Sequence, residues 1–415
     1  MNHFEYRRGK LFAEDVPLAA LAAAVGTPVY VYAEATLRRH VRVLHQAFAG
    51  HPHLICYAVK ANPNLALLAL LKSEDVGFDV VSGGELARVV KAGGSPSRTV
   101  FAGVGKTRDE MAQALRAGLM MFNVESAEEL ELLGQVGREL GRAAPFAIRV
   151  NPDVDARTHR HISTGHKASK FGVPFDEAAA LYARARRRFP GALIARGVDC
   201  HIGSQLTQAG PVKAAVTKVA AFFQTLKAKE PGLEYLDVGG GLGITYDRET
   251  PPSLEAYART ILTAVKGTGA TLVLEPGRVI VGNAGVLLTR VLFRKVTQEK
   301  TFVTVDVGMN DLLRPALYDA FHALQPLTQR AGTRVPVEVV GPICESTDVL
   351  ARARPMVLPR QGELYAIMSA GAYGMSMAST YNSRPRPAEV LVSGDSYRII
   401  RDRERTEDLW RGEAL

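Results

Sequence analysis

The sequence is poor in cysteine and tryptophan and has no long apolar run. Of its 415 residues, three are cysteine and one is tryptophan. So few thiols, in an odd number, argue against a disulfide framework and fit a reducing compartment, so we expect a cytoplasmic protein. The longest apolar stretches, such as Leu65–Leu71, fall far short of the roughly 20 residues that span a bilayer. The first residues resemble no secretory signal, and we expect no membrane partner.

Basic residues exceed acidic ones, with 51 Lys and Arg against 42 Asp and Glu. The densest basic run, Ala183–Arg188, lies in a segment that we predict to be helical, and it has no interleaved aromatic residues and no zinc-finger spacing. We interpret it as a solvated helix face and expect no nucleic-acid partner, although a basic balance also suits an enzyme with anionic ligands. His159, His161 and His166 lie in a polar loop without acidic or cysteine partners at ligand spacing, so we expect no metal site.

The first two thirds of the chain alternate short β-like runs with helix-like segments. Eight apolar runs have the composition of buried parallel strands: 54–59, 77–81, 98–102, 119–124, 145–150, 193–202, 234–238 and 272–275. Capping-box patterns begin the helices after Ser82, Thr107 and Ser126. Eight successive units match a (β/α)8 TIM barrel of roughly 250 residues, which we place at residues 31–282. A doubly wound sheet is the alternative.

The texture changes after about Gly285, where β-like runs separated by glycine and proline replace the long helices. This pattern predicts an all-β sandwich or barrel domain over residues 283–415. The N-terminal segment, residues 1–30, contains one alanine-rich helix at Leu18–Val25, and we expect it to pack with the β domain. The run Pro28–Tyr32 could lead into the barrel or pair back into the β domain.

Barrel enzymes carry their chemistry at the carboxyl ends of the strands. Lys60 ends the first strand, where partial desolvation would lower its pKa and favour the neutral amine of a Schiff-base lysine; the alternative is a lysine that reaches solvent. Gly239–Gly241 and Pro276–Arg278 follow strands seven and eight, the usual place of a phosphate site, although a tight turn also needs glycine. His201 could stack on a flat ligand, move a proton or be a core histidine.

Four segments stand out in the β domain. Asp306–Tyr318 ends a strand with a cluster of polar groups, and Gly341–Ser346 places the Cys344 thiol beside a carboxylate. Gly371–Gly374 exposes an aromatic hydroxyl between glycines, and Tyr381–Pro387 is a rigid basic loop. Alone, a Cys–Glu pair is a weak signal, because a free cysteine is usually an inert core residue.

Together these segments resemble the alanine-racemase-like (fold type III) pyridoxal-phosphate decarboxylases over about residues 28–392. The motifs that carry the resemblance are Tyr57–Asn62, Cys200–Ser204, Asp237–Gly241, Glu275–Arg278, Met309–Tyr318, Gly341–Ser346 and Gly371–Gly374. The glutamate after Cys344 fits the diaminopimelate branch. The resemblance implies a homodimer with active sites shared between subunits. It also implies decarboxylation of meso-2,6-diaminopimelate to L-lysine and CO2, the last step of lysine biosynthesis.

The resemblance also implies a role for each motif residue. Lys60 would hold pyridoxal 5′-phosphate covalently, His201 would stack on its ring, and Glu275 would face the ring nitrogen. Asp79 would lie near the Lys60 end of the cofactor. The phosphate or its surroundings would contact Ser204, Gly240, Gly241, Gly277, Arg278 and Tyr373.

The far end of the substrate would meet a second set of residues. Arg278, Arg314 and Tyr318 would bind its carboxylate, Glu345 would bind its ammonium group, and Tyr373 would also line the pocket. Cys344, supplied by the partner subunit, would protonate the carbanion after CO2 leaves. Lys60, His201 and Cys344 would thus be the catalytic residues.

Other functions remain open at this point. The enzyme could act on a related amino acid, such as D-lysine, D-ornithine, carboxynorspermidine or a siderophore precursor. A racemase on the same barrel would need a basic tyrosine opposite Lys60, for which Tyr373 is the one candidate. An inactive cofactor-binding relative should lack Lys60 or Cys344, and both are present. Whether the polar loop Ile162–Gly172 acts as a lid is also open.

Overall fold

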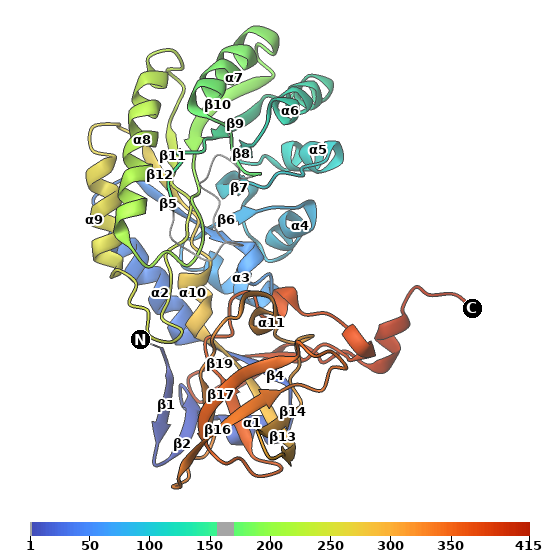
Figure 1. The fold of residues 1–415 in the computed structure, drawn as a ribbon. Coiled ribbons are helices and arrows are strands. Elements are labelled where there is room, and N and C mark those ends of the chain that lie inside the picture. The colour runs from blue at the N-terminus through green and yellow to red at the C-terminus, as the bar shows by residue number, and fades with distance from the viewer. Residues whose placement is uncertain (1, 156–169) are drawn as a thin grey trace. The chain divides into compact units, whose positions relative to one another are not determined.

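The computed structural model describes residues 2–155 and 170–415, and the chain divides into two compact units (Figure 1). The unit that we call the barrel unit comprises His40–Ile244 and Thr250–Val279. The unit that we call the β unit comprises Met1–Arg39, Thr245–Glu249 and Ile280–Leu415. Each unit is described by itself below.

In the described part of the barrel unit, eight parallel strands close into a barrel. Their order is β5 (His53–Ala58), β6 (Gly77–Val80), β7 (Thr99–Phe101), β8 (Met121–Val124), β9 (Ala144–Arg149), β10 (Leu193–Asp199), β11 (Tyr235–Asp237) and β12 (Thr271–Leu274). β12 pairs with β5, which closes the barrel and excludes the doubly wound alternative. The predicted TIM barrel is therefore confirmed.

Helices connect most of these strands and lie around the outside of the barrel (Figure 1). They are α3 (Leu65–Lys72), α4 (Gly83–Lys91), α5 (Arg108–Ala117), α6 (Ala127–Leu140), α7 (Phe175–Arg188), α8 (Ala209–Lys227) and α9 (Leu254–Ala264), and α2 (Glu34–Ala47) precedes β5. The basic run lies on α7, where Arg184 and Arg188 form ion pairs with Glu131 and Arg186 pairs with Glu230. Cys56 is buried in an apolar cluster with Leu54 and Val100 of the barrel strands.

The helix starts confirm one of the three capping boxes in full. Thr107 accepts the Glu110 N–H, and the Glu110 side chain accepts the Thr107 N–H. Ser82 and Ser126 also cap their helices, but Glu85 and Glu129 accept the N–H groups of the residues before the caps. The prediction of a reciprocal capping box at these two helices is wrong. The carboxylates of Glu85 and Glu129 bind the N–H of the residue before the cap instead of the N–H of the cap itself.

The β unit contains a mixed sheet of nine strands in its described residues. Its main path is β17 (Val349–Val357), β16 (Arg334–Val340), β14 (Thr301–Val305), β13 (Gly285–Val296), β4 (Val29–Ala33), β19 (Ala388–Ser393) and β20 (Ser396–Arg401), with β18 (Leu364–Ile367) on β13 and β15 (Leu324–Pro326) on β18. β4 lies between β13 and β19, so the run Pro28–Tyr32 pairs into the β unit rather than starting the barrel.

A small three-stranded sheet precedes β4 in the β unit. It consists of β1 (Phe4–Arg7), β2 (Lys10–Ala13) and β3 (Val16–Pro17), and the predicted helix α1 (Leu18–Val25) follows it. Leu11, Leu18 and Leu21 pack in one apolar core with Val31 and Val390 of the large sheet. None of the helices in the described ranges is both long enough and apolar enough to cross a membrane.

Candidate active site

Lys60 lies in a short 3-10 helix, Val59–Ala61, directly after β5. Its Nζ atom is 2.6 Å from Oδ2 of Asp79, the register partner of Ala58 on the neighbouring strand β6. The Asp79 side chain is fully buried, whereas that of Lys60 is 36 % exposed. The pair therefore holds a solvent-accessible amine at the carboxyl end of the barrel with a buried negative charge beside it.

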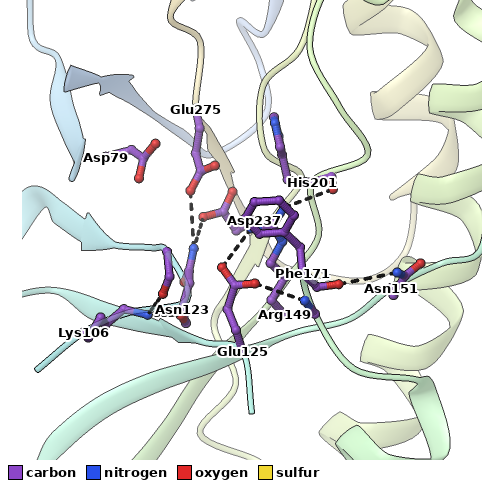
Figure 2. Close-up of polar contacts among 12 residues, drawn as sticks. Asp79, Lys106, Asn123, Glu125, Arg149, Asn151, Phe171, His201, Asp237 and Glu275 are labelled. Carbon is purple, nitrogen blue, oxygen red and sulfur yellow. Dashed lines mark hydrogen bonds and ion pairs between the residues drawn. The ribbon is translucent and has the colours of Figure 1, made fainter. Parts of the chain in front are cut away.

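Three more carboxyl groups lie at the same end of the barrel: Asp199 on β10, Asp237 on β11 and Glu275 after β12. One oxygen of each lies within 4.8 Å of the others. The Asn123 amide donates to Asp237 Oδ2 at 3.1 Å and to Glu275 Oε1 at 3.3 Å (Figure 2). We call these three carboxyl groups the carboxyl cluster.

The pKa values of the carboxyl cluster are raised. Burial raises the pKa of Asp237 to about 6 and places the pKa of Asp199 well above its usual value. The pKa of Glu275 is also raised well above its usual value, first by burial and then by Asp237 and Asp79. Because like charges this close do not all ionise, a cationic neighbour would favour ionisation of the cluster.

His201 follows β10 and has a neutral ring. Burial, with Arg149 and Lys60 nearby, places its pKa well below the usual histidine value. The Gly240 N–H donates to His201 Nδ1 at 3.1 Å, so the ring proton lies on Nε2. A neutral, flat ring in a fixed orientation can stack on an aromatic ligand without adding charge to the site.

The three glycines after β11 are required by packing. Gly239 has a φ of +67° and Gly241 a φ of +99°, and a Cβ atom on Gly240 would lie 2.1 Å from the Glu275 carbonyl oxygen. Close packing alone therefore explains all three, so the glycines are weaker evidence for a phosphate site than the sequence suggested. Stronger evidence comes from Arg278, which is buried and donates to Ser204 Oγ at 3.2 Å.

A second layer of charged residues supports His201 and was not assigned a role from the sequence. Arg149, at the end of β9, pairs with Glu125 at 2.9 Å and donates to the His201 carbonyl oxygen at 3.3 Å. The Phe171 ring lies 4.8 Å from the Arg149 guanidinium carbon, and the Gly172 N–H donates to Glu125 (Figure 2). The sequence feature that could have identified Arg149 as a site residue is its position as a charged residue at the end of an apolar strand.

Phe171 and Gly172 are the described end of the loop that we considered as a lid. Residues 162–169 of that loop, and His159, His161 and His166, lie outside the described residues.

In the β unit, Arg314 and Tyr318 are the first and last residues of the short helix α11 (Arg314–Tyr318). The Arg314 Nη1 atom lies 2.8 Å from His322 Nε2, and His322 Nδ1 lies 2.8 Å from the Met368 carbonyl oxygen. A carbonyl only accepts, so Nδ1 carries the proton and Nε2 accepts from Arg314. The Arg314 guanidinium also lies over the Tyr246 ring, 4.6 Å from its centroid.

Cys344 and Glu345 lie on the exposed loop between β16 and β17. The Cys344 N–H donates to Asn382 Oδ1 at 2.7 Å. Tyr373 follows β18 in a left-handed conformation, with a φ of +55°. The structure thus places one group of predicted site residues in the β unit, namely Arg314, Tyr318, Cys344, Glu345 and Tyr373. It places the other group, Lys60, Asp79, His201, Ser204, Gly240, Gly241, Glu275, Gly277 and Arg278, in the barrel unit.

Residues 34–282 match the family model described as "Pyridoxal-dependent decarboxylase, pyridoxal binding domain". The barrel and this match define the chain as a pyridoxal-dependent decarboxylase. Over its full length the chain is 51 % identical to the diaminopimelate decarboxylase of Pseudomonas aeruginosa, covering 99 % of that protein. It is 49 % identical to that of Vibrio cholerae, again covering all of this chain and 99 % of the relative.

Solved structures agree with these relatives. Diaminopimelate decarboxylase from Helicobacter pylori, complexed with L-lysine, matches 95 % of this chain and 98 % of its own with a TM-score of 0.92 and 43 % identity. The enzyme from M. jannaschii, also in complex with L-lysine, matches 100 % of this chain and 99 % of its own with a TM-score of 0.94 and 36 % identity. The chain belongs to the diaminopimelate decarboxylase family.

Proposed function

We propose that the protein decarboxylates meso-2,6-diaminopimelate to L-lysine and CO2, the last step of lysine biosynthesis, with pyridoxal 5′-phosphate as cofactor. The observation that carries the proposal is the Lys60–Asp79 pair beside the carboxyl cluster at the carboxyl end of the barrel. Family membership supports the substrate, since this chain is 51 % identical over its whole length to a diaminopimelate decarboxylase.

The residues of the barrel unit fit this cofactor. Asp79 Oδ1 is buried and has no hydrogen-bond partner among the described residues, and the adjacent carboxyl cluster favours a cationic neighbour. Arg278 and Ser204 offer a guanidinium and a hydroxyl to an anion. A ligand with a protonated ring nitrogen and a phosphate group would complement both parts of the unit.

Each barrel residue then has a definite task. Lys60 would hold the cofactor covalently through Nζ, Glu275 would keep a proton at the ring nitrogen, and the neutral His201 ring would stack on the cofactor. The phosphate or its surroundings would contact Ser204, Gly240, Gly241, Gly277, Arg278 and Tyr373. When bound, pyridoxal phosphate supplies the conjugated electron sink that stabilises the negative charge left when CO2 departs.

The remaining residues would bind and protonate the substrate. Arg278, Arg314 and Tyr318 would hold the carboxylate at its far end, where a guanidinium can bind both oxygens. Glu345 would bind the far ammonium group, Tyr373 would line the same pocket, and the Cys344 thiol would deliver a proton to the α-carbon. We propose that the enzyme is a cytoplasmic homodimer in which Cys344 is supplied by the partner subunit.

The decisive test measures CO2 released by the purified, cofactor-loaded protein from meso-diaminopimelate, D-lysine and D-ornithine in parallel. We expect fast release from meso-diaminopimelate and little from the other two. Turnover of D-lysine or D-ornithine without turnover of meso-diaminopimelate would reject the substrate but keep the cofactor chemistry. Proton exchange at the α-carbon without CO2 release would instead indicate a racemase.

A further inference from the structure

Asp348 joins two loops of the β unit. It precedes β17 and is 3 % exposed. Its Oδ1 atom accepts the Met309 N–H at 2.7 Å, and its Oδ2 atom accepts the Ile343 N–H at 2.7 Å. Met309 belongs to the loop that leads to Arg314, whereas Ile343 directly precedes Cys344. One buried carboxylate therefore links the two loops through both of its oxygens.

The backbone of Asp348 closes the second of these loops. The Asp348 N–H donates to the Glu345 carbonyl oxygen at 3.1 Å, and the Asp348 carbonyl oxygen accepts the Gly341 N–H at 3.1 Å. Three residues of the turn that carries Cys344 and Glu345 therefore bind to Asp348: Gly341, Ile343 and Glu345.

The two loops approach so closely that side chains are excluded between them. A Cβ atom on Gly341 would lie 2.3 Å from Asp348 Oδ2 and 2.6 Å from the Gly308 Cα atom. A Cβ atom on Gly308 would lie 2.8 Å from Ile343 Cγ1. Glycine at both positions lets the carboxylate reach both N–H groups at once, so the contact has one narrow geometry.

We propose that Asp348 is a positioning residue for the decarboxylation, which fixes the Cys344–Glu345 loop against the loop that carries Arg314. The inference rests on the proposed function for the roles of these three residues. In the proposed homodimer Cys344 serves the site of the partner subunit, so the contact that Asp348 makes within its own subunit would set the geometry of a group in the other site.

A carboxylate suits this task better than the amide of the same shape. Both partners of the Asp348 side chain are N–H donors, and both carboxylate oxygens accept. In Asp348→Asn the carboxamide can accept only one N–H and turns its own NH2 group towards the other donor. The variant should therefore release one loop from the other while it keeps the size of the side chain.

The test compares Asp348→Asn with Glu389→Gln as a matched control. Glu389 is a carboxylate of the same unit that is 1 % exposed, and it accepts from the Tyr32 hydroxyl and from Arg401. The cofactor-loaded enzymes are compared in their melting temperatures, their kcat and KM, and the rate at which iodoacetamide alkylates Cys344, measured by peptide mass spectrometry. Cys56 and Cys200 are buried, so the label reports on Cys344.

We expect Asp348→Asn to change the Cys344 alkylation rate at least about threefold and to lower kcat about tenfold or more, because small displacements of reacting groups are costly. Cofactor content should stay normal, and Glu389→Gln should keep wild-type kinetics even if its melting temperature falls. Equal alkylation rates and normal kcat in folded Asp348→Asn would overturn the proposal and leave Asp348 a merely structural residue.

If Asp348→Asn does not fold, Asp348→Ser takes its place, since serine is smaller and keeps one acceptor; normal alkylation and kcat there would overturn the proposal in the same way. The alkylation measurement needs no substrate. A wild-type protein that fails to decarboxylate meso-diaminopimelate would therefore reject the proposed function, while the comparison of alkylation rates still decides whether Asp348 places Cys344.

Discussion

The barrel unit and the β unit hold their functional groups in different ways. In the barrel unit, Lys60, His201 and Glu275 lie at strand ends, and burial and neighbouring charges control them. A carboxylate lies beside the amine, the imidazole is desolvated, and three acids, Asp79, Asp199 and Asp237, raise the pKa of Glu275. In the β unit, Cys344 and Glu345 are exposed on a loop that is fixed by hydrogen bonds to backbone N–H groups.

Substitutions in the two units should therefore impair the enzyme in different ways. Substitutions in the barrel unit should change protonation and cofactor binding, because burial and neighbouring charges determine which form each group takes. Substitutions in the β-unit loops that carry Arg314 and Cys344 should leave the cofactor in place and change how substrate is bound or protonated. Cofactor content and turnover measured on the same sample therefore distinguish the two units.

The largest effect should come from Lys60→Ala. Without the amine that would hold the cofactor covalently, activity should fall by about a thousandfold or more. The visible absorbance of the lysine-linked cofactor should disappear, and borohydride should no longer fix the cofactor to the protein. A visible band that borohydride still reduces in this variant would sink the assignment of Lys60.

Cys344→Ala should give the next largest effect and the opposite pattern. Loss of a general acid lowers turnover by about 10²–10⁴-fold, but the thiol lies on a loop of the β unit, so cofactor content and absorbance should stay normal. Cys344→Ser is the matched variant that keeps the size of the group. Weak cofactor binding with normal turnover per bound cofactor would show that the thiol does not donate the proton.

The carboxyl cluster predicts a pH dependence of stability. Burial raises the pKa of Asp237 in the folded protein from the usual aspartate value of 3.8 to about 6. A raised pKa means that ionisation costs stability, so this contribution is lost as the pH rises from about 4 through about 6. Asp237→Asn removes the ionisation and should gain at most about 3 kcal/mol of unfolding free energy relative to wild type over that interval.

Urea unfolding of the cofactor-free wild-type and Asp237→Asn proteins at pH 4.5 and pH 7.5 checks this prediction. The variant can also accept only one of the two bonds that Asp237 receives from Asn123 and from the Gly239 N–H, but that loss is similar at both pH values. The informative quantity is therefore the difference in unfolding free energy between the variant and the wild type, and how it changes from pH 4.5 to pH 7.5. The raised pKa is contradicted if this difference is the same at both pH values, or if the variant becomes less stable relative to the wild type at the higher pH.

The sequence predicts the fold best where strands are buried on both faces. The barrel strands are continuous apolar runs with capped helices between them, so their order along the chain is enough to predict closure. β17 and β20 show no such apolar run, because much of their surface is exposed and carries arginine and other polar residues, such as Arg352 and Arg398. Edge and half-exposed strands carry a weaker signal than buried ones.

The site was predictable to the extent that its residues stand out locally. Lys60 and Glu275 are charged residues at the ends of apolar runs, which is unusual in any structural context. Asp348 and His322 have no such signal, because each acts through contacts that the sequence does not display. Asp348 meets a backbone group 39 positions away, and His322 meets the Met368 carbonyl 46 positions away. Only the folded β unit brings these partners together.

The smallest effect should come from His322→Leu. This variant tests a residue whose contacts are distant in the sequence. His322 Nε2 accepts from Arg314, and the tautomer is fixed by the Met368 carbonyl oxygen, so the imidazole orients the guanidinium. Losing one hydrogen bond to a charged group costs about 1.5–3 kcal/mol, and some of this is recovered because Arg314 still lies over the Tyr246 ring. We therefore expect KM for meso-diaminopimelate to rise about tenfold with kcat nearly unchanged.

His322→Gln is the matched variant, since its amide oxygen can accept from Arg314 and should restore part of the affinity. The dissociation constant of L-lysine, which carries the far ammonium and carboxylate groups, should rise in parallel with KM. A lower kcat at unchanged KM would place His322 in the chemical step rather than in substrate binding. Such a result would weaken the contrast between the two units, because a residue of the β unit would then act on the reaction centre itself.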